Sequence, residues 1–169
     1  MTRVKAGIAL GSNLGDRRAQ IVAARDFVFS LHGDDEAPRR SQLYETEPVD
    51  CAPGTAAFLN AVVEIETSLA PMDLLQKLRN YERSSGRAKD RAKNSPREID
   101  LDLLYMGELH LDSSALVLPH PRMVSRRFVL QPLADIRADL VLPGQIASIA
   151  QLLSALAPEP AARLVTREW

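Results

Sequence analysis

Two aspartates separated by one residue, Asp100 and Asp102, are the side chains of this sequence best suited to hold a metal ion. They lie in the run Ile99-Asp100-Leu101-Asp102-Leu103, where apolar and acidic residues alternate with the period of a half-buried strand. Residues two apart on a strand share a face, so both carboxylates are expected to point the same way. Neighbouring carboxylates repel, and hard oxygen ligands without a cysteine favour Mg²⁺ over zinc. The pair alone leaves a solvated acidic strand face as the alternative.

Cationic side chains are concentrated directly before this pair. Seven of the chain's 21 basic residues fall between residues 79 and 97, namely Arg79, Arg83, Arg87, Lys89, Arg91, Lys93 and Arg97. A bound polyphosphate would account for this arrangement, because carboxylates hold a metal that bridges phosphate oxygens while arginine and lysine neutralise the remaining charge. A solvated loop whose cations pair with surface acids remains the alternative. Arg97, three residues before Asp100, is the strongest phosphate candidate.

Two smaller groups of residues suggest contacts to a flat, charged ligand. His120 stands between two prolines, which hold its backbone extended, and a rigid histidine near arginines could donate to phosphate. Phe58 and Asn60 lie on the polar face of an expected strand, where Phe58 could stack on a heterocycle while Asn60 reads its edge. A surface histidine, and a phenylalanine that covers a sheet edge, are the plainer alternatives. The segment 11–13 is interpreted as a turn rather than a phosphate loop, and no Walker-type loop is present.

Composition narrows the class of protein. The chain has 169 residues, 46% of them hydrophobic and 25% charged, which predicts one globular domain over residues 1–169. A net charge of −1 gives no support to a nucleic-acid or membrane surface. The single cysteine, Cys51, excludes an internal disulfide and a cysteine zinc site and is consistent with a reducing cytoplasm. The apolar run near the N-terminus is too short for a signal peptide. We therefore expect a monomeric cytoplasmic protein without membrane or nucleic-acid partners.

Hydrophobic periodicity predicts the elements that must position these side chains. We expect strands at 4–10, 42–46, 58–67 and 98–105, with a possible hairpin partner at 109–112. Helices are expected at about 16–31, from Pro71 to the stop at Gly86, and at about 146–156. Residues 84–96 are expected to form a loop, 119–145 a mostly irregular stretch, and 158–169 a peripheral tail. This order predicts an α+β fold in which two helices cover one face of an antiparallel sheet and the other face carries the active site.

Five motifs together resemble one enzyme family. They are Gly11-Ser12-Asn13-Leu14-Gly15-Asp16, Tyr44-Glu45-Thr46-Glu47-Pro48, Phe58-Leu59-Asn60-Ala61, Pro96-Arg97-Glu98-Ile99-Asp100-Leu101-Asp102, and Leu118-Pro119-His120-Pro121-Arg122-Met123 with Arg126 and Phe128. In this order they closely resemble the 6-hydroxymethyl-7,8-dihydropterin pyrophosphokinases of folate synthesis. The resemblance extends from about Val4 to Leu156. The two last motifs in tandem are highly specific, whereas any one motif alone would be weak.

The resemblance implies a ferredoxin-like sandwich that transfers pyrophosphate from ATP to the pterin hydroxymethyl oxygen and releases AMP. It implies two Mg²⁺ ions on Asp100 and Asp102, with catalytic roles for Arg87, Arg97, Asp100 and Asp102. It implies ATP contacts at Glu82, Arg87, Lys89, Arg97, Leu103, His120 and Arg126. It implies pterin contacts at Thr46, Val49, Phe58, Asn60, Asp100 and Phe128. Some family members have a tryptophan that seals the pterin site, where this chain has Asn94.

A non-enzymatic alternative remains at this point. Ferredoxin-like folds often bind RNA, and the basic segment with Phe58 could serve that purpose. The acidic pair argues against it, because two carboxylates repel phosphates unless a metal is bound. The substrate alcohol has a high pKa and no dedicated strong base is evident, so metals and positioning are expected to supply most of the rate. Asp100 is the one candidate to accept the hydroxyl proton.

Overall fold

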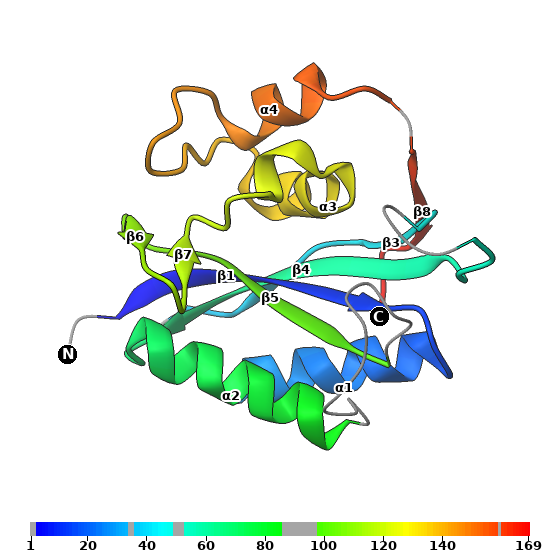
Figure 1. Ribbon diagram of the computed structural model, residues 1–169, viewed down its shortest axis with the longest axis horizontal. Coiled ribbons are helices and arrows are strands. Elements are labelled where there is room, and N and C mark those ends of the chain that lie inside the picture. Colours follow the sequence, from blue (N-terminus) through cyan, green and yellow to red (C-terminus); the bar gives the residue numbers. More distant parts are fainter. Residues whose placement is uncertain (1–2, 34–35, 49–52, 86–97, 159) are drawn as a thin grey trace.

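The computed structural model describes residues 3–33, 36–48, 53–85, 98–158 and 160–169 (Figure 1). Its strands are β1 (Val4–Ser12), β2 (Arg39–Arg40), β3 (Leu43–Thr46), β4 (Phe58–Thr67), β5 (Asp100–Met106), β6 (Leu111–Asp112), β7 (Val117–Leu118) and β8 (Ala162–Thr166). Its α-helices are α1 (Arg17–Phe29), α2 (Pro71–Ser84), α3 (Arg127–Arg137) and α4 (Ile149–Ala155), and a 3-10 turn spans Met123–Ser125. None of these helices has the length and apolar content needed to cross a bilayer.

The main sheet is antiparallel, with strand order β5-β1-β4-β3-β8, and β2 pairs with β4. Strands β6 and β7 form a separate two-stranded ribbon. The long central strands β1 and β4 pair from Val4↔Thr67 to Ser12↔Leu59. The expected α+β class with an antiparallel sheet is therefore confirmed. The first strand runs two residues further than expected and includes Gly11, so this glycine lies within a strand rather than in a turn.

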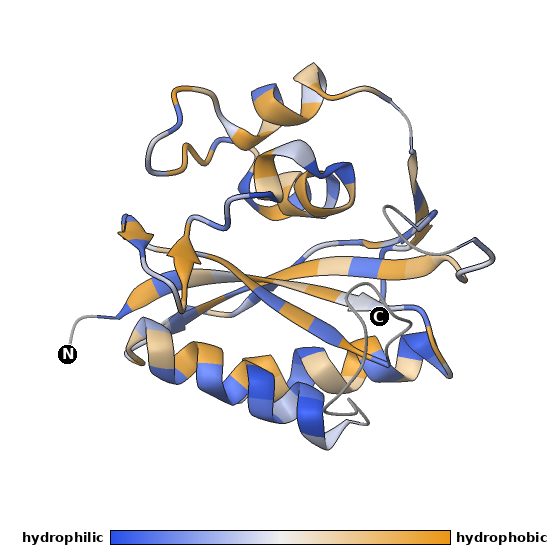
Figure 2. Ribbon diagram, viewed as in Figure 1, coloured by the Kyte–Doolittle hydropathy of each residue, from blue (hydrophilic) through white to orange (hydrophobic). Residues whose placement is uncertain are grey.

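Helices α1 and α2 cover one face of the sheet (Figure 1). Asp16 caps α1 by accepting from the Ala19 N–H, and Pro71 opens α2 at its first turn. Their apolar stripes pack on alternate residues of the central strands, including Ile8, Leu10 and Ile65. Hydrophilic residues lie on the outer side of α2 (Figure 2). This face is therefore an apolar core of the kind that the periodicity predicts.

The opposite face is also covered by helices, which corrects the expected arrangement with helices on one face only. Helices α3 and α4 lie above the sheet in Figure 1, and Val129, Leu130 and Leu133 of α3 pack on Val62 and Tyr105. The stretch expected to be irregular thus contains an eleven-residue helix. Its Pro132 interrupts the helical pattern in the sequence, because proline removes one helical hydrogen bond and usually marks an end.

The C-terminal residues are part of the sheet, which corrects the expected peripheral tail. Strand β8 pairs with β3 through Thr46↔Ala162 and its neighbours. Trp169 is 9% exposed, and its indole N–H donates to the Ser41 carbonyl at 2.9 Å. Arg25 and Arg40 lie over the indole ring at 5.3 and 5.7 Å from its centroid. Main-chain pairing and the buried indole therefore hold the end of the chain against β3 and α1.

A register shift in β5 decides which residues face α3. Ile8 pairs with Leu103 while Gly7 pairs with Tyr105, so Leu104 is an extra residue in the strand. This β-bulge turns Leu104 and Tyr105 to the α3 side, and Met106 returns to the α1/α2 core. Asp100 and Asp102 precede the bulge and lie on the same face as Tyr105. The chain thus places two acids and a tyrosine on one face of a single strand.

Candidate active site

A row of paired residues crosses the uncovered end of the sheet face. Gly11 of β1 pairs with Asp100 of β5 on one side and with Asn60 of β4 on the other. Directly paired residues share a face, and neighbouring strands are about 4.8 Å apart. Asp100 and Asn60 therefore flank Gly11 at about 10 Å from each other, measured between backbones. A side chain at Gly11 would lie 3.3 Å from Asn60 Oδ1, so the absent side chain leaves a flat floor.

Asp102 lies one step further along the same face, paired with Ala9. Both aspartates are partly exposed, whereas Ile99, Leu101 and Leu103 are buried. The alternation expected for this strand is thus what the structure has. Leu103, expected to contact ATP, is 3% exposed and packs in the α1/α2 core, so only its backbone can face a ligand on the other side.

Glu82 reaches this strand from α2. It is 3% exposed, and its Oε1 accepts from the Leu101 N–H at 2.8 Å. Leu101 lies between the two aspartates, so the buried carboxylate fixes the backbone that carries them. An ionised acceptor makes such a hydrogen bond stronger than a neutral one would. Glu82 was expected to contact ATP. Its hydrogen bond to the Leu101 N–H indicates instead that it positions strand β5.

His120 approaches the opposite end of β5. Its backbone N–H donates to the Leu104 carbonyl at 2.7 Å. The Leu118–Pro119 peptide bond just before it is cis. Burial lowers the pKa of His120, as do the nearby Arg126 and Arg122, while Asp100 acts in the opposite direction. Nδ1 accepts from the Arg122 N–H at 3.2 Å, so the neutral ring carries its proton on Nε2. The ring therefore offers one donor at neutral pH.

Phe58 and Thr46 lie beside this row, one step along the strands on the same face of the sheet. They pair with each other across β3 and β4, and Asn60 donates from Nδ2 to Thr46 Oγ1 at 2.6 Å. Asn60 is only 6% exposed, so this hydrogen bond fixes the orientation of its amide. The Phe58 ring comes within 4.0 Å of the place where a Gly11 side chain would begin. The expected ring-reading residues thus lie together around the glycine floor.

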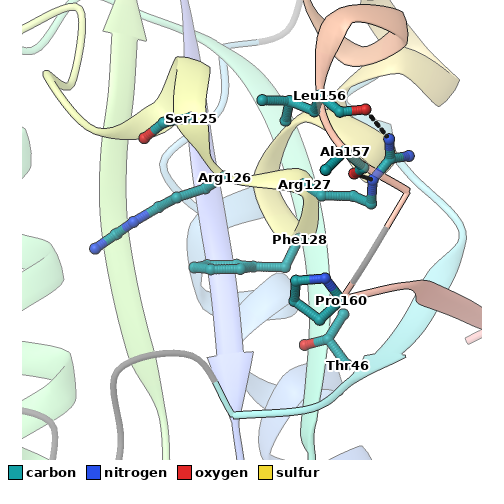
Figure 3. Close-up of a pocket in the computed structure, with 8 residues that line it drawn as sticks. All are labelled: Thr46, Ser125, Arg126, Arg127, Phe128, Leu156, Ala157 and Pro160. Atoms are coloured by element: carbon teal, nitrogen blue, oxygen red, sulfur yellow. Dashed lines mark hydrogen bonds between the residues drawn. The ribbon is translucent and has the colours of Figure 1, made fainter.

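Arg126 and Phe128 come from the start of α3. Arg126 lies over the Phe128 ring at 5.4 Å from its centroid. Both line a pocket of about 150 Å³, together with Thr46, Ser125, Arg127, Leu156, Ala157 and Pro160 (Figure 3). Figure 3 shows Arg126 extending away from Leu156 and Ala157, whereas Arg127 turns toward their carbonyls. The start of α3 therefore supplies one aromatic wall and one cation to the site.

Four expected site residues lie outside the described residues: Val49, Arg87, Lys89 and Arg97. Asn94, the position of the family tryptophan, also lies outside them. Among the residues that the structure describes, Asp100 and Asp102 share one site face with Asn60, Phe58 and Thr46, and both Arg126 and Asp100 act on the pKa of His120.

Three features of this site were missed in the sequence. Gly11 was interpreted as part of a turn, although the alternation of Val4, Ala6, Ile8 and Leu10 could have been continued through it. Leu156, Ala157 and Pro160, from the end of the expected last helix onward, line the pocket, and no motif marks them. The third is the role of Glu82, because a buried edge contact between a helix and a strand has no periodic signal.

The donor set suits Mg²⁺ better than a transition metal. No cluster of three or more His, Cys, Asp or Glu side chains that could hold a metal is found in the described parts of the chain. The candidate ligands are therefore the carboxylates of Asp100 and Asp102, two residues apart on one strand. Mg²⁺ is commonly bound by one or two carboxylates, with substrate phosphates and water completing its coordination shell. The side chains thus fit a metal that arrives with a polyphosphate.

Comparison with known proteins gives a consistent result. Residues 7–138 match the family model described as 7,8-dihydro-6-hydroxymethylpterin-pyrophosphokinase (HPPK). A 2-amino-4-hydroxy-6-hydroxymethyldihydropteridine pyrophosphokinase of Pseudomonas aeruginosa is 43% identical over 136 residues, which cover 80% of this chain and 82% of that protein. The Bacillus subtilis protein of the same name is 41% identical over 129 residues, covering 76% and 75%.

A solved structure supports the fold. The crystal structure of an HPPK-DHPS in complex with substrates superposes with a TM-score of 0.72 at 14% identity. The match covers 91% of this chain and 43% of that one. At such low identity the likeness concerns the fold alone. The candidate site lies mostly within the matched residues 7–138, whereas Leu156, Ala157 and Pro160 lie beyond them.

Proposed function

The chain belongs to the 7,8-dihydro-6-hydroxymethylpterin-pyrophosphokinase family, and from this premise we propose which residues bind the substrates and carry out the transfer. It transfers pyrophosphate from ATP to the hydroxymethyl group of 6-hydroxymethyl-7,8-dihydropterin and releases AMP, a step in folate biosynthesis. The hydroxymethyl oxygen bonds to the β-phosphorus, and the bond from that phosphorus to the oxygen shared with the α-phosphate breaks. ATP is thus the co-substrate.

The row Asp100–Gly11–Asn60 is the observation that carries the proposed assignment of residues. It brings a carboxylate suited to a metal and an amide suited to a ring edge onto one face, about 10 Å apart between backbones. A bicyclic pterin spans a comparable distance. The ring would lie over Gly11 between Phe58 and Phe128, with Asn60 and the backbone around Thr46 and Val49 reading its edge. The hydroxymethyl group would then point toward Asp100.

Asp100 and Asp102 would hold two Mg²⁺ ions along the triphosphate. When bound, the metal neutralises phosphate charge and lowers the barrier for the attacking and leaving oxygens. Asp100 would also accept the hydroxyl proton as the new bond forms. Glu82 would act indirectly, because its hydrogen bond to the Leu101 N–H sets the direction of both aspartates. Removal of Glu82 would therefore misplace the pair without removing a ligand.

Arg126 and His120 would bind ATP from the α3 side. His120 would donate from Nε2, the nitrogen left free by the contact of Nδ1 with the Arg122 N–H. Arg87, Lys89 and Arg97 would neutralise the phosphates from the basic segment, with Arg97 at the transferring group. These groups would hold the substrates in line, and positioning would supply most of the rate.

Some coarser properties are carried forward as parts of this proposal. The strand order β5-β1-β4-β3 with α1 and α2 on one face supports a ferredoxin-like sandwich. A single cysteine, Cys51, supports a cytoplasmic location. A net charge of −1 supports small-molecule substrates without a nucleic-acid partner, and we retain a monomer as the expected state.

The proposal is tested with purified protein, ATP, Mg²⁺ and hydroxymethyldihydropterin, followed by mass detection of the products. Pterin diphosphate and AMP in equal amounts are expected, and Asp100→Asn should abolish both. Formation of ADP as the sole nucleotide product would instead indicate an ordinary kinase. Full activity of Asp100→Asn would contradict the assignment of the metal pair.

A further inference from the structure

The residues that line the pocket beside Phe128 come from three parts of the chain that are distant in sequence. They are Thr46 of β3, residues 125–128 at the start of α3, and Leu156, Ala157 and Pro160 (Figure 3). We call residues 156–158 and 160–169 the C-terminal strap. The family match ends at residue 138, so the strap lies outside it. The site thus has a wall that the matched region does not supply.

Arg127 fastens the start of this strap to α3. Its Nε donates to the Ala157 carbonyl at 2.9 Å, and Nη2 donates to the Leu156 carbonyl at 3.0 Å and to the Leu153 carbonyl at 3.4 Å. The last carbonyls of a helix have no partner within the helix, so the guanidinium satisfies the end of α4. Arg127 therefore donates to the backbone of the strap, whereas its neighbour Arg126 extends away from Leu156 and Ala157 (Figure 3).

The far end of the strap is fastened independently. Ala162 pairs with Thr46, itself a pocket residue, and Trp169 is buried with its N–H on the Ser41 carbonyl. A wall held at both ends does not swing away when a ligand enters, so its shape is formed in advance. Such a wall excludes ligand groups that do not fit its shape. Groups that do fit bind without the free-energy cost of ordering the wall.

The chemistry of the pocket defines what it accepts. Leu156, Ala157, Pro160 and the Phe128 ring present apolar surface, and Nε and Nη2 of Arg127 donate to backbone carbonyls. A cavity of about 150 Å³ accommodates one six-membered ring. The apolar lining from Leu156, Ala157, Pro160 and Phe128 therefore suits an uncharged, ring-sized or alkyl part of a ligand.

We infer that the C-terminal strap is a specificity-determining wall of the pterin site, where Leu156 and Pro160 contact an uncharged edge of the ring system and Arg127 holds the wall in place. The inference rests on the proposed placement of the pterin against Phe128. It assigns a role in substrate selection to Leu156 and Pro160 and a positioning role to Arg127. The strap sets how large a substituent the pterin can carry.

The test compares Leu156→Ala with Leu164→Ala, since Leu164 lies on the same strap but is 43% exposed and outside the pocket. Leu156→Ala should raise the KM and Kd of hydroxymethyldihydropterin about tenfold, while kcat and the Kd of ATP change less than about twofold. Leu164→Ala should change none of these. Arg127→Met should raise the pterin KM in the same way, with the ATP Kd unchanged, because Arg127 acts through the strap.

Selectivity provides the second readout. Hydroxymethyldihydropterins that each carry one extra methyl group at a different ring position are assayed with both leucine variants. For at least one of them, kcat/KM relative to the natural substrate should rise about tenfold or more in Leu156→Ala only. If Leu156→Ala matches Leu164→Ala in every assay while the wild-type protein makes pterin diphosphate, the strap inference is wrong and the proposed function stands. If the wild-type protein makes no pterin diphosphate, the proposed function itself fails.

Discussion

Two halves of one sheet face are built on the same strand and have opposite roles. Gly7 and Gly11 both lie on the α3 side of β1. At Gly7 an added Cβ would lie 2.2 Å from Tyr105 Cε1, so the ring lies flat on the backbone. At Gly11 the atom nearest to such a Cβ is Asn60 Oδ1, at 3.3 Å. One glycine makes room for a packed side chain, and the other leaves the floor over which the pterin is proposed to lie.

Polar residues occur in both halves, and their roles differ because helix α3 covers only one half. In the covered half, Tyr105 donates to Glu64 at 2.5 Å, and Arg137 of α3 donates to the same carboxylate at 2.8 Å. In the open half, Asp100 and Asn60 lie beyond the apolar cluster under α3. A buried carboxylate with its cation fastens α3 to the sheet, whereas an accessible one is available for chemistry.

The largest effect is expected in the open half. Asp102→Asn should lower kcat by about 10³-fold or more, because the variant lacks one of the two carboxylates proposed to hold the metal. The melting temperature should stay within about 2 °C, since the side chain is not part of the core. Turnover and thermal unfolding are measured on the same preparation, with exposed Asp112→Asn as the control. A large fall in melting temperature would show that Asp102 is structural, like Glu64.

In the covered half, Gly7→Ala should affect stability first. The added methyl group must displace the Tyr105 ring and disturb its bond to Glu64, at a loss of roughly 3 kcal/mol in unfolding free energy. Urea denaturation monitored by circular dichroism measures this. The molecules that remain folded should bind ATP normally. If Gly7→Ala is as stable as the wild-type protein, the Tyr105 ring can move aside at no cost, and the close packing of the ring on Gly7 does not contribute to stability.

Gly11→Ala provides the matched change at the other end of the strand. We expect little change in the unfolding free energy, because the new methyl group meets the end of the Asn60 side chain and lies at ordinary van der Waals distance from the Phe58 ring. The KM for the pterin should rise about tenfold, since the floor is no longer flat. Equal losses of stability in the two alanine variants would remove the distinction between the halves.

A smaller effect is expected for Tyr105→Phe. The variant keeps the ring over Gly7 and loses only the hydroxyl that donates to Glu64, so unfolding free energy should fall by about 1 kcal/mol. Arg137 still accompanies the carboxylate. Pterin and ATP affinities, measured by equilibrium fluorescence titration, should remain at wild-type values. A specific loss of pterin affinity would indicate that the network transmits strain to Phe128.

The smallest effect concerns pH. The pKa of His120 is lowered in the folded protein, mainly by burial and by Arg126 and Arg122. The unfolded chain therefore binds more protons below a pH of about 6.5, so His120 reduces stability as the pH falls through this range. Between pH 7.5 and 5.5 the wild-type protein should lose slightly more unfolding free energy than His120→Gln. An equal loss in both proteins would contradict the lowered pKa.

Sequence reasoning succeeded where a local period determines the structure. The alternation around Asp100 and Asp102 predicted a shared face, and the apolar period after Pro71 predicted helix α2. These features depend only on residues a few positions apart. The floor at Gly11 was missed because its importance comes from Asp100 and Asn60, which lie on two other strands.

Other features depend on long-range contacts. Helix α3 was not predicted because Pro132 lies inside it. Packing of the apolar residues of α3 on the sheet compensates for the proline, and this packing cannot be read from the local sequence. Strand β8 has no buried stripe, and its pairing with β3 is set by the anchor at Trp169. The bulge at Leu104 left a trace in the sequence, because Leu103-Leu104 interrupts the alternation, but a doubled leucine does not show which way the next residues turn.

The bulged strand β5 is also the outermost strand of the sheet, and an outermost strand is open to addition of a strand from another chain. Two of its outward groups are already used: Glu82 accepts the Leu101 N–H, and the His120 N–H takes the Leu104 carbonyl. A foreign strand would have to displace both before it could form a regular ladder. The side chain that orients the acidic pair and the backbone that presents the histidine therefore also protect the protein from edge-to-edge aggregation.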